Sequence, residues 1–221
     1  MKKMIVAFVL LSSVMAVSQT KFGIKAGGNI ATFTGKSFYD VGGRVGFQAG
    51  GFAEIKLSDR NFIQVDLLYS EQGAKVDFKD VLSDGISTLT YDEKWKLSYI
   101  NLPVMFKFYA AQHLFFEAGP QLGVFLNAKS KYTTTLYAPE LELIGPYDAT
   151  KSGKERMSED FKGLDVALNV GFGYDFTDHI FANARYSYGL VNIYEIRTDQ
   201  NWSSEMKGHN NVFSLSAGYK F

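Results

Sequence analysis

The sequence predicts an all-β protein, an eight-stranded antiparallel up-and-down transmembrane β-barrel, and three observations support this fold class. Eight segments alternate apolar with polar residues, which is the pattern of strands that have one apolar face. Each segment reaches the roughly 9–11 residues that a tilted strand needs to cross a bilayer. The connections alternate between short and long, as in barrels with turns on one side of the membrane and loops on the other.

The start of the chain predicts export. Two lysines precede an almost wholly apolar run over residues 4–15, and Ala16-Val17-Ser18 places small residues just before Gln19. This is the pattern of a secretory signal peptide, and the apolar run is too short to be a transmembrane helix. A buried N-terminal helix is the alternative. We therefore expect residues 1–18 to be a signal peptide cleaved before Gln19, and residues 19–221 to be one barrel domain in the outer membrane of a Gram-negative cell envelope.

The composition excludes several classes of protein. The chain has no Cys, which excludes a disulfide scaffold, a Cys-based metal site and a lipoprotein anchor. The 23 basic residues balance the 23 acidic residues, so nothing indicates a nucleic-acid partner. We expect no cofactor and no metal, because the acidic residues of the longest connection lack the ordered oxygen-ligand pattern of a calcium site; these residues are Asp148, Glu155, Glu159 and Asp160.

The eight expected strands each have one face without a charged residue. They run over Phe22–Phe33, Gly43–Leu57, Asn61–Gly73, Trp95–Tyr109, His113–Asn127, Gly163–Phe176, His179–Val191 and Asn211–Phe221. A lipid-facing Lys or Arg near the bilayer midplane costs about 2–4 kcal/mol, so the uncharged faces are expected to contact lipid. A soluble β-sandwich or lipocalin-like barrel shows the same alternation with its apolar face inward. The long strands, the signal peptide and the many small residues on the polar faces favour the membrane.

The connections predict the topology. The short ones are Ser58–Arg60, Ala110–Gln112 and Thr177–Asp178, and the long ones are Thr34–Gly42, Lys75–Lys94, Ala128–Lys162 and Asn192–Asn210. We expect both termini and the short turns in the periplasm and the four long loops outside. The third loop is polar and contains two prolines, so it is expected to be either disordered or to form a small extra hairpin at Tyr132–Tyr137.

Charged residues on the polar faces form the main candidate site. The interior of an eight-stranded barrel is just wide enough to be filled by side chains, and buried charges must pair. We therefore expect a structural ion network that plugs the lumen, in which Arg185 pairs with carboxylates. A binding site or a proton path is the alternative. The expected members are Lys25, Glu54, Asp66, Lys107, Glu117 and Arg185.

The last strand predicts a second functional feature. Its alternate apolar residues end on an aromatic residue, which is typical of the signal that barrel-assembly machinery recognises; the residues are Phe213, Leu215, Tyr219 and Phe221. A terminal strand with an apolar face can produce the same pattern by chance. Elsewhere, four aromatic residues are expected in the girdles at the membrane interfaces, namely Trp95, Tyr99, Tyr186 and Tyr188.

Five stretches of the sequence, taken in order, are similar to a known family. They are Phe22-Gly23-Ile24-Lys25-Ala26-Gly27-Gly28-Asn29, Asp66-Leu67-Leu68-Tyr69-Ser70-Glu71-Gln72-Gly73, Tyr99-Ile100-Asn101-Leu102-Pro103, Arg185-Tyr186-Ser187-Tyr188-Gly189-Leu190 and Gly218-Tyr219-Lys220-Phe221. With them the chain resembles the PorT-like outer-membrane barrels of Bacteroidetes-type bacteria. Asp66 and Asn101 depart from the pattern, because the family usually has Glu there. The resemblance implies an outer-membrane barrel, and one namesake of the family is tied to protein secretion and gliding machinery.

The sequence does not predict an enzyme. Two of its three His, His113 and His179, fall at the short turns, and no Ser–His–acid spacing is recognisable. We expect a non-enzymatic membrane anchor, scaffold or interaction protein, with a link to secretion machinery implied by the resemblance. The alternative is a narrow gated channel or porin for small solutes. The expected partners of this monomeric barrel are outer-membrane lipid, the barrel-assembly machinery, and envelope or secretion-system proteins bound through the loops.

Overall fold

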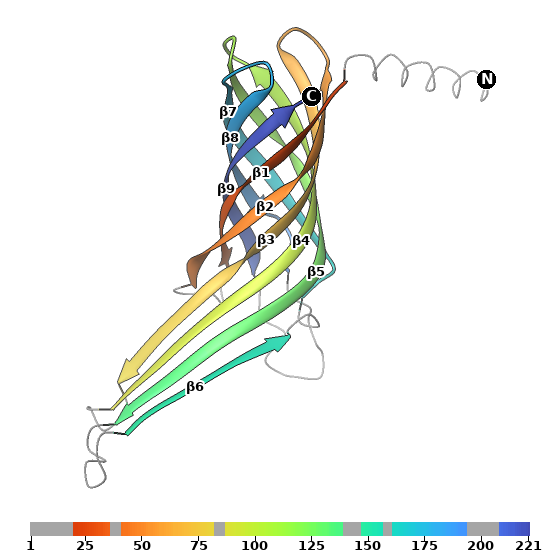
Figure 1. Ribbon diagram of the computed structural model, residues 1–221. Coiled ribbons are helices and arrows are strands. Elements are labelled where there is room, and N and C mark those ends of the chain that lie inside the picture. The colour runs from red at the N-terminus through yellow and green to blue at the C-terminus, as the bar shows by residue number, and fades with distance from the viewer. Residues whose placement is uncertain (1–19, 36–40, 82–86, 139–146, 157–160, 194–207) are drawn as a thin grey trace, which may run out of the picture.

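In the residues that it describes, the computed structural model is an antiparallel sheet of nine strands, eight of which close into a barrel (Figure 1). The structure describes residues 20–35, 41–81, 87–138, 147–156, 161–193 and 208–221. The strands are β1 (Thr20–Thr34), β2 (Val41–Lys56), β3 (Asn61–Val81), β4 (Thr88–Tyr109), β5 (Leu114–Ala138), β6 (Tyr147–Arg156), β7 (Leu164–Asp175), β8 (Ile180–Gly189) and β9 (His209–Lys220). The predicted signal peptide lies outside the described residues. Within those ranges, no helix is long and apolar enough to cross a membrane.

Pairing between the first and last strands closes the ring. Each strand of the barrel pairs antiparallel with its neighbours in the order β1–β2–β3–β4–β5–β7–β8–β9, and β9 pairs again with β1 from Gly23↔Lys220 to Thr34↔His209. β6 is outside the ring and pairs with β5 alone. The predicted eight-stranded antiparallel barrel is therefore confirmed, with one additional strand attached to it.

The two faces of the barrel wall differ as the alternation predicts. The large apolar side chains of the uncharged faces are exposed on the outside, with Leu67 58% and Leu215 61% exposed, whereas Asp66 and Lys107 on the opposite face are completely buried. β1 begins and β9 ends at the same end of the barrel as the short turns (Figure 1). By the rule that short turns face the periplasm, we assign this end to the periplasm and the opposite end to the outside.

Three strands continue well past the predicted ends. Gly73, Trp95 and Asn127 were the expected outer ends of strands that in fact reach Val81, Thr88 and Ala138. The predicted second loop is therefore mostly strand, and the third connection contains an extra hairpin, longer than expected, between β5 and β6. The physical reason is that β3 to β6 keep their backbone hydrogen bonds after leaving the membrane, where an apolar face is no longer required. Their outer parts form a four-stranded sheet that projects beyond the barrel and is here called the arm (Figure 1). It consists of Gly73–Val81 of β3, Thr88–Lys96 of β4, Lys129–Ala138 of β5 and Tyr147–Arg156 of β6.

Local backbone irregularities shape the start of the arm. Gly73 has a φ of 131°, and a Cβ at this position would lie 1.9 Å from the carbonyl oxygen of Trp95, so only glycine fits. Ser98 pairs with Asn127 and Tyr99 pairs with Phe125, so β5 has one extra residue at this point. The extra residue reverses the alternation of β5 beyond it, and Ala128 is therefore buried inside the barrel. The arm begins directly after this register shift.

The prediction of aromatic girdles is wrong for two of the four residues. Tyr99 is 1% exposed inside the barrel, and Trp95 is partly buried against the same apolar cluster. Both residues are at alternate positions of β4 that face the inside of the barrel, and the pairing of β4 with its neighbours fixes this orientation. Tyr186 and Tyr188 are exposed on the outside of β8, at 43% and 50%.

Candidate functional site

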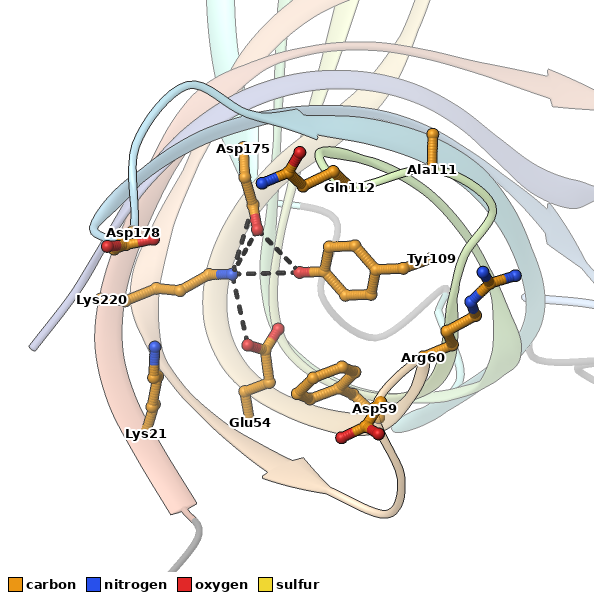
Figure 2. Close-up of a pocket in the computed structure, with 11 residues that line it drawn as sticks. Lys21, Glu54, Asp59, Arg60, Tyr109, Ala111, Gln112, Asp175, Asp178 and Lys220 are labelled. Carbon is orange, nitrogen blue, oxygen red and sulfur yellow. Dashed lines mark hydrogen bonds and ion pairs between the residues drawn. The ribbon is translucent and has the colours of Figure 1, made fainter.

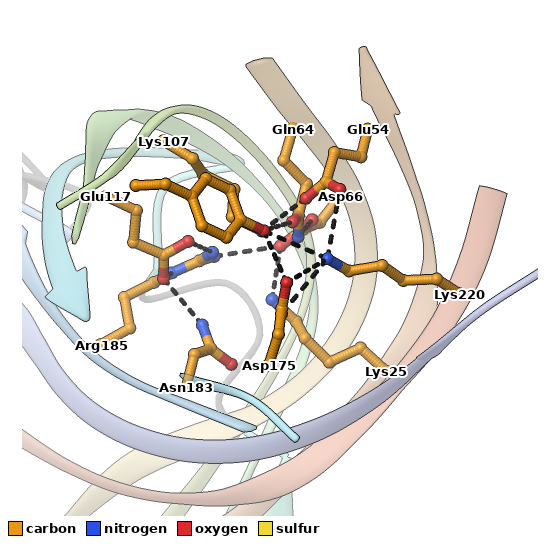
Figure 3. Close-up of polar contacts among 11 residues, drawn as sticks. Lys25, Glu54, Gln64, Asp66, Lys107, Glu117, Asp175, Asn183, Arg185 and Lys220 are labelled. Carbon is orange, nitrogen blue, oxygen red and sulfur yellow. Dashed lines mark hydrogen bonds and ion pairs between the residues drawn. The ribbon is translucent and has the colours of Figure 1, made fainter. Parts of the chain in front are cut away.

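The lumen contains a network of buried charges, and Asp66 on β3 is at its centre (Figure 3). Its Oδ2 accepts hydrogen bonds from Lys25 Nζ at 2.6 Å and from Arg185 Nη1 at 3.1 Å. Its Oδ1 accepts a further bond from Gln64 Nε2 at 2.5 Å. Strand alternation places Gln64 and Asp66 on the same inward face, so β3 supplies both the charge and the amide that orients it.

Arg185 on β8 joins Asp66 to a second carboxylate. Its Nε and Nη2 donate to the two oxygens of Glu117, each at 3.0 Å, which is a bidentate pair. Asn183 Nδ2 also donates to Glu117 Oε1 at 2.7 Å. Gly171 lies beside this group, and a Cβ there would be 3.0 Å from Glu117 Oε1. The absence of a side chain on β7 thus leaves room for the carboxylate.

A second part of the network lies nearer the periplasmic turns. Lys107 Nζ lies 2.5 Å from Glu54 Oε2, and Lys220 Nζ lies 3.3 Å from Glu54 Oε1. Lys220 also lies 3.1 Å from Asp175 Oδ2, to which the Tyr109 hydroxyl donates a bond of 2.8 Å. Every charge in this group therefore has an opposite charge beside it, as buried ions require.

All six residues of the predicted lumen network lie in this cluster, and each is at most 4% exposed. Arg185 contacts Asp66 and Glu117, whereas Glu54 pairs with the two lysines instead. The prediction omitted Lys220 and Asp175, although alternation places both on the inward faces of β9 and β7. It also omitted the uncharged partners Tyr109, Gln64 and Asn183. The only sequence signal for them is that strand alternation places all three on inward faces.

Two apolar clusters fill the lumen together with the charged network. Phe52, Phe115 and Phe181 pack together beside the part of the network nearer the periplasm, and Lys107 Nζ lies 4.0 Å from the Phe115 ring centroid. At the outer side, a larger cluster fills the mouth; it consists of Phe33, Ala74, Leu97, Tyr99, Ala128, Phe161 and Ile193. The described lumen is thus filled at several heights, and this arrangement suits a solid support.

A shallow vestibule opens at the periplasmic end (Figure 2). Its volume is about 480 Å³, and its lining includes Lys21, Arg60, Glu54, Asp175 and Lys220. The deep charges bind one another, so its floor is the ion network itself. At the rim, the hydrogen bond from Lys56 holds the pKa of Asp59 below its ordinary value. Within the described ranges, no group of His, Asp or Glu is arranged to hold a metal ion.

The residues of the predicted assembly signal lie on the outer face of β9 and at its end. Phe213, Leu215, Tyr219 and Phe221 are 48%, 61%, 43% and 69% exposed. The Phe221 amide donates a backbone hydrogen bond of 2.8 Å to the carbonyl oxygen of Phe22, the last bond of the seam between β9 and β1. The side chains are therefore accessible from the membrane, while the backbone helps to close the barrel.

Comparison with known proteins gives one family match. Residues 16–195 match the family model described as outer membrane protein beta-barrel domain. No curated protein sequence matches the chain. Among solved structures, the chain is similar to the attachment invasion locus protein Ail of Yersinia pestis, at 12% identity and a TM-score of 0.45 over 92% of this chain and 99% of that one. It is also similar to Neisserial surface protein A, at 13% identity and a TM-score of 0.48 over 90% and 97% of the two chains.

Proposed function

The chain belongs to the family of outer membrane protein beta-barrel domains, and from this premise we propose that it is a non-enzymatic anchor whose arm contacts another protein of the cell envelope. The barrel holds the chain in the outer membrane. The arm, built from the outer parts of β3 to β6, is available to a partner outside the membrane (Figure 1).

The observation that carries the proposal is the inward face of the arm, which continues the lumen side of the barrel wall. Alternation and register place aromatic and aliphatic side chains together on it, all of them partly exposed: Val76, Tyr91, Tyr132 and Leu136. Large aromatic residues are enriched in protein–protein interfaces, and this sheet carries them outside the membrane, where lipid does not explain them. The filled lumen supports an anchor over the alternative of a channel for small solutes.

The finer assignment to the PorT-like barrels is part of the proposal. It rests on the five ordered stretches of similarity, which include Lys25 and Arg185 of the lumen network. A role beside protein secretion machinery follows from that resemblance. We further propose that the barrel works as a monomer and that the barrel-assembly machinery recognises the outward side chains of β9.

A barrel that lacks the outer part of the arm tests the proposal. The register pairs Val76↔Glu93 and Tyr132↔Gly153 allow both hairpins to be closed early, so residues 77–92 and 133–152 are each replaced by an Asn-Gly turn. Tagged full-length and shortened proteins are purified from cross-linked native envelopes, and co-purifying proteins are quantified by mass spectrometry. We expect the shortened barrel to remain heat-modifiable in detergent gels and to lose the envelope partner.

Point variants locate the contact on one face. Tyr91→Gln with Tyr132→Gln changes the inward face, and Thr90→Gln with Thr133→Gln changes the outward face of the same two strands. Only the inward pair is expected to reduce the yield of the cross-linked partner. The proposal is wrong if the shortened barrel retains every partner that the full-length protein captures, or if both pairs reduce the yield equally.

A further inference from the structure

The outward face of the arm, which continues the lipid-facing side of the wall, has an unusual distribution of charge. Lys75 on β3 lies directly opposite Lys94 on β4, and Lys94 lies directly opposite Lys131 on β5. In the next row, Lys96 lies directly opposite Lys129. Like charges at opposed positions of an antiparallel sheet are destabilising, so each of these three cross-strand pairs is unfavourable.

Neighbouring carboxylates neutralise only part of this face. Lys75 lies 2.7 Å from Asp77, Lys94 lies 3.9 Å from Asp92, and Lys96 pairs with Glu71. In the part of the chain that the structure describes, no carboxylate lies within ion-pair distance of Lys129 or Lys131, and both lysines are exposed. The β5 side of the rows is therefore left with uncompensated positive charge.

The height of these lysines relative to the membrane indicates what neutralises them. Leu126 is the last large apolar residue on the lipid-facing side of β5 and is 47% exposed. Lys129 is three residues further on, about 10 Å along the strand and about 7 Å in height at a strand tilt of about 40°. The headgroup layer is about 5–8 Å thick on each side of the hydrocarbon core, so Lys129 lies at this layer. Lys131 lies just above it and can reach down on its flexible stem.

We propose that this face, defined by Lys75, Lys94, Lys96, Lys129 and Lys131, binds the phosphate groups of phosphorylated lipid in the outer leaflet around the barrel. Neighbouring strands are about 4.8 Å apart, so lysines on two strands can donate to one phosphate. The lipid phosphate removes the repulsion between opposed lysines. The site is separate from the inward face of the arm, so it and the proposed protein contact are tested independently.

The test compares lipid binding by purified full-length protein and matched variants. Lys129→Gln with Lys131→Gln removes the two unpaired charges, whereas Lys79→Gln with Lys151→Gln removes two arm charges away from these rows. Lys151 lies opposite Thr134, on the inward parity of the arm, and Lys79 lies four residues beyond Lys75. Native mass spectrometry measures the binding of a bis-phosphorylated glucosamine lipid and of the same lipid after phosphatase treatment. EDTA is present so that no divalent cation bridges a protein carboxylate to a lipid phosphate.

We expect wild-type protein to retain the phosphorylated lipid and to bind the dephosphorylated lipid weakly. The Lys129/Lys131 variant should lose roughly 30-fold in affinity, since each lysine near an anionic membrane surface contributes about 1 kcal/mol. Arginine at both positions should restore binding, and millimolar inorganic phosphate should not displace the lipid. Equal binding of the two lipids, displacement by free phosphate, or an equal loss in the Lys79/Lys151 variant would overturn the proposal. Heat-modifiable migration of every variant establishes that each barrel is folded.

Discussion

Lys25 on β1 and Arg185 on β8 donate to the same oxygen, Oδ2 of Asp66, at 2.6 and 3.1 Å. The two cations are on strands separated by β9, and Asp66 reaches them from β3 across the lumen. One carboxylate therefore connects opposite walls of the barrel.

Replacing this shared carboxylate is the most direct test of the network. Asp66→Asn leaves two buried cations competing for Glu117, so we expect it to lower the free energy of unfolding by about 3–5 kcal/mol. Urea titration of the protein in lipid vesicles, followed by tryptophan fluorescence, measures this. Asp59→Asn is the control, because its ion pair with Lys56 is in a turn where the Asp59 side chain is 97% exposed, and it should change the midpoint little. Equal midpoints for the two variants would contradict a stabilising role.

The space beside Glu117 gives a second prediction. A Cβ on Gly171 would lie 2.6 Å from the Ala184 carbonyl oxygen, so Gly171→Ala must move the backbone of β8 next to Arg185. We expect a loss of about 1–3 kcal/mol in the same urea titration. Gly28→Ala is the matched change, since its Cβ would meet only the Gly46 carbonyl oxygen, at 3.9 Å, and it should be neutral within about 0.5 kcal/mol. A neutral Gly171→Ala would mean that the lumen is less tightly packed than described.

The filled lumen predicts electrical behaviour. We expect the purified barrel to produce no regular single-channel steps in a planar bilayer, because the ion network and the apolar clusters occupy its cross-section. A porin of known conductance, reconstituted in the same way, is the positive control. Reproducible steps that change in size with Arg185→Ala would favour the channel hypothesis instead.

The side chain and the backbone of Phe221 have separate expected roles, recognition by the assembly machinery and closure of the barrel. Phe221→Ala keeps the backbone hydrogen bond to Phe22 and removes an aromatic ring that is 69% exposed. We expect outer-membrane levels in cells to fall several-fold, while the unfolding midpoint of protein refolded in vitro changes little, since exposed side chains contribute little to stability. Leu168→Ala changes a lipid-facing side chain of β7 that is 50% exposed, and it should leave the levels in cells unaltered. Normal levels of the Phe221 variant would refute a role in assembly.

Alternation in the sequence predicted the ring and its two faces, because membrane strands must keep charge away from lipid. Five of the eight predicted strands match β1, β2, β7, β8 and β9 to within two residues at each end. The outer ends of β3, β4 and β5 were missed, because the arm is polar on one face and the sequence does not mark where strands leave the bilayer.

For the lumen network, the sequence predicts which residues face inward, but not how far along the barrel axis each of them lies. Alternation along β7 and β9 places Asp175 and Lys220 on the inward faces, yet their contact depends on how far β9 is displaced along its neighbours, which no local pattern records. The register shift on β5 had the same effect, because one extra residue turned Ala128 inward. Single-residue displacements between strands thus decide which charges meet.

The pairing of the first strand with the last has a consequence for the order of events during biogenesis. Gly23 can pair with Lys220 only after almost the whole chain has been exported. Asp66 can bind Arg185 only after the 119 residues that lead to Arg185 have followed it. Until then the early strands have open edges and unpaired charges in the periplasm. Such long-range closure is slow and exposes the chain to aggregation, so a nascent barrel of this kind depends on holding factors until its final residues arrive.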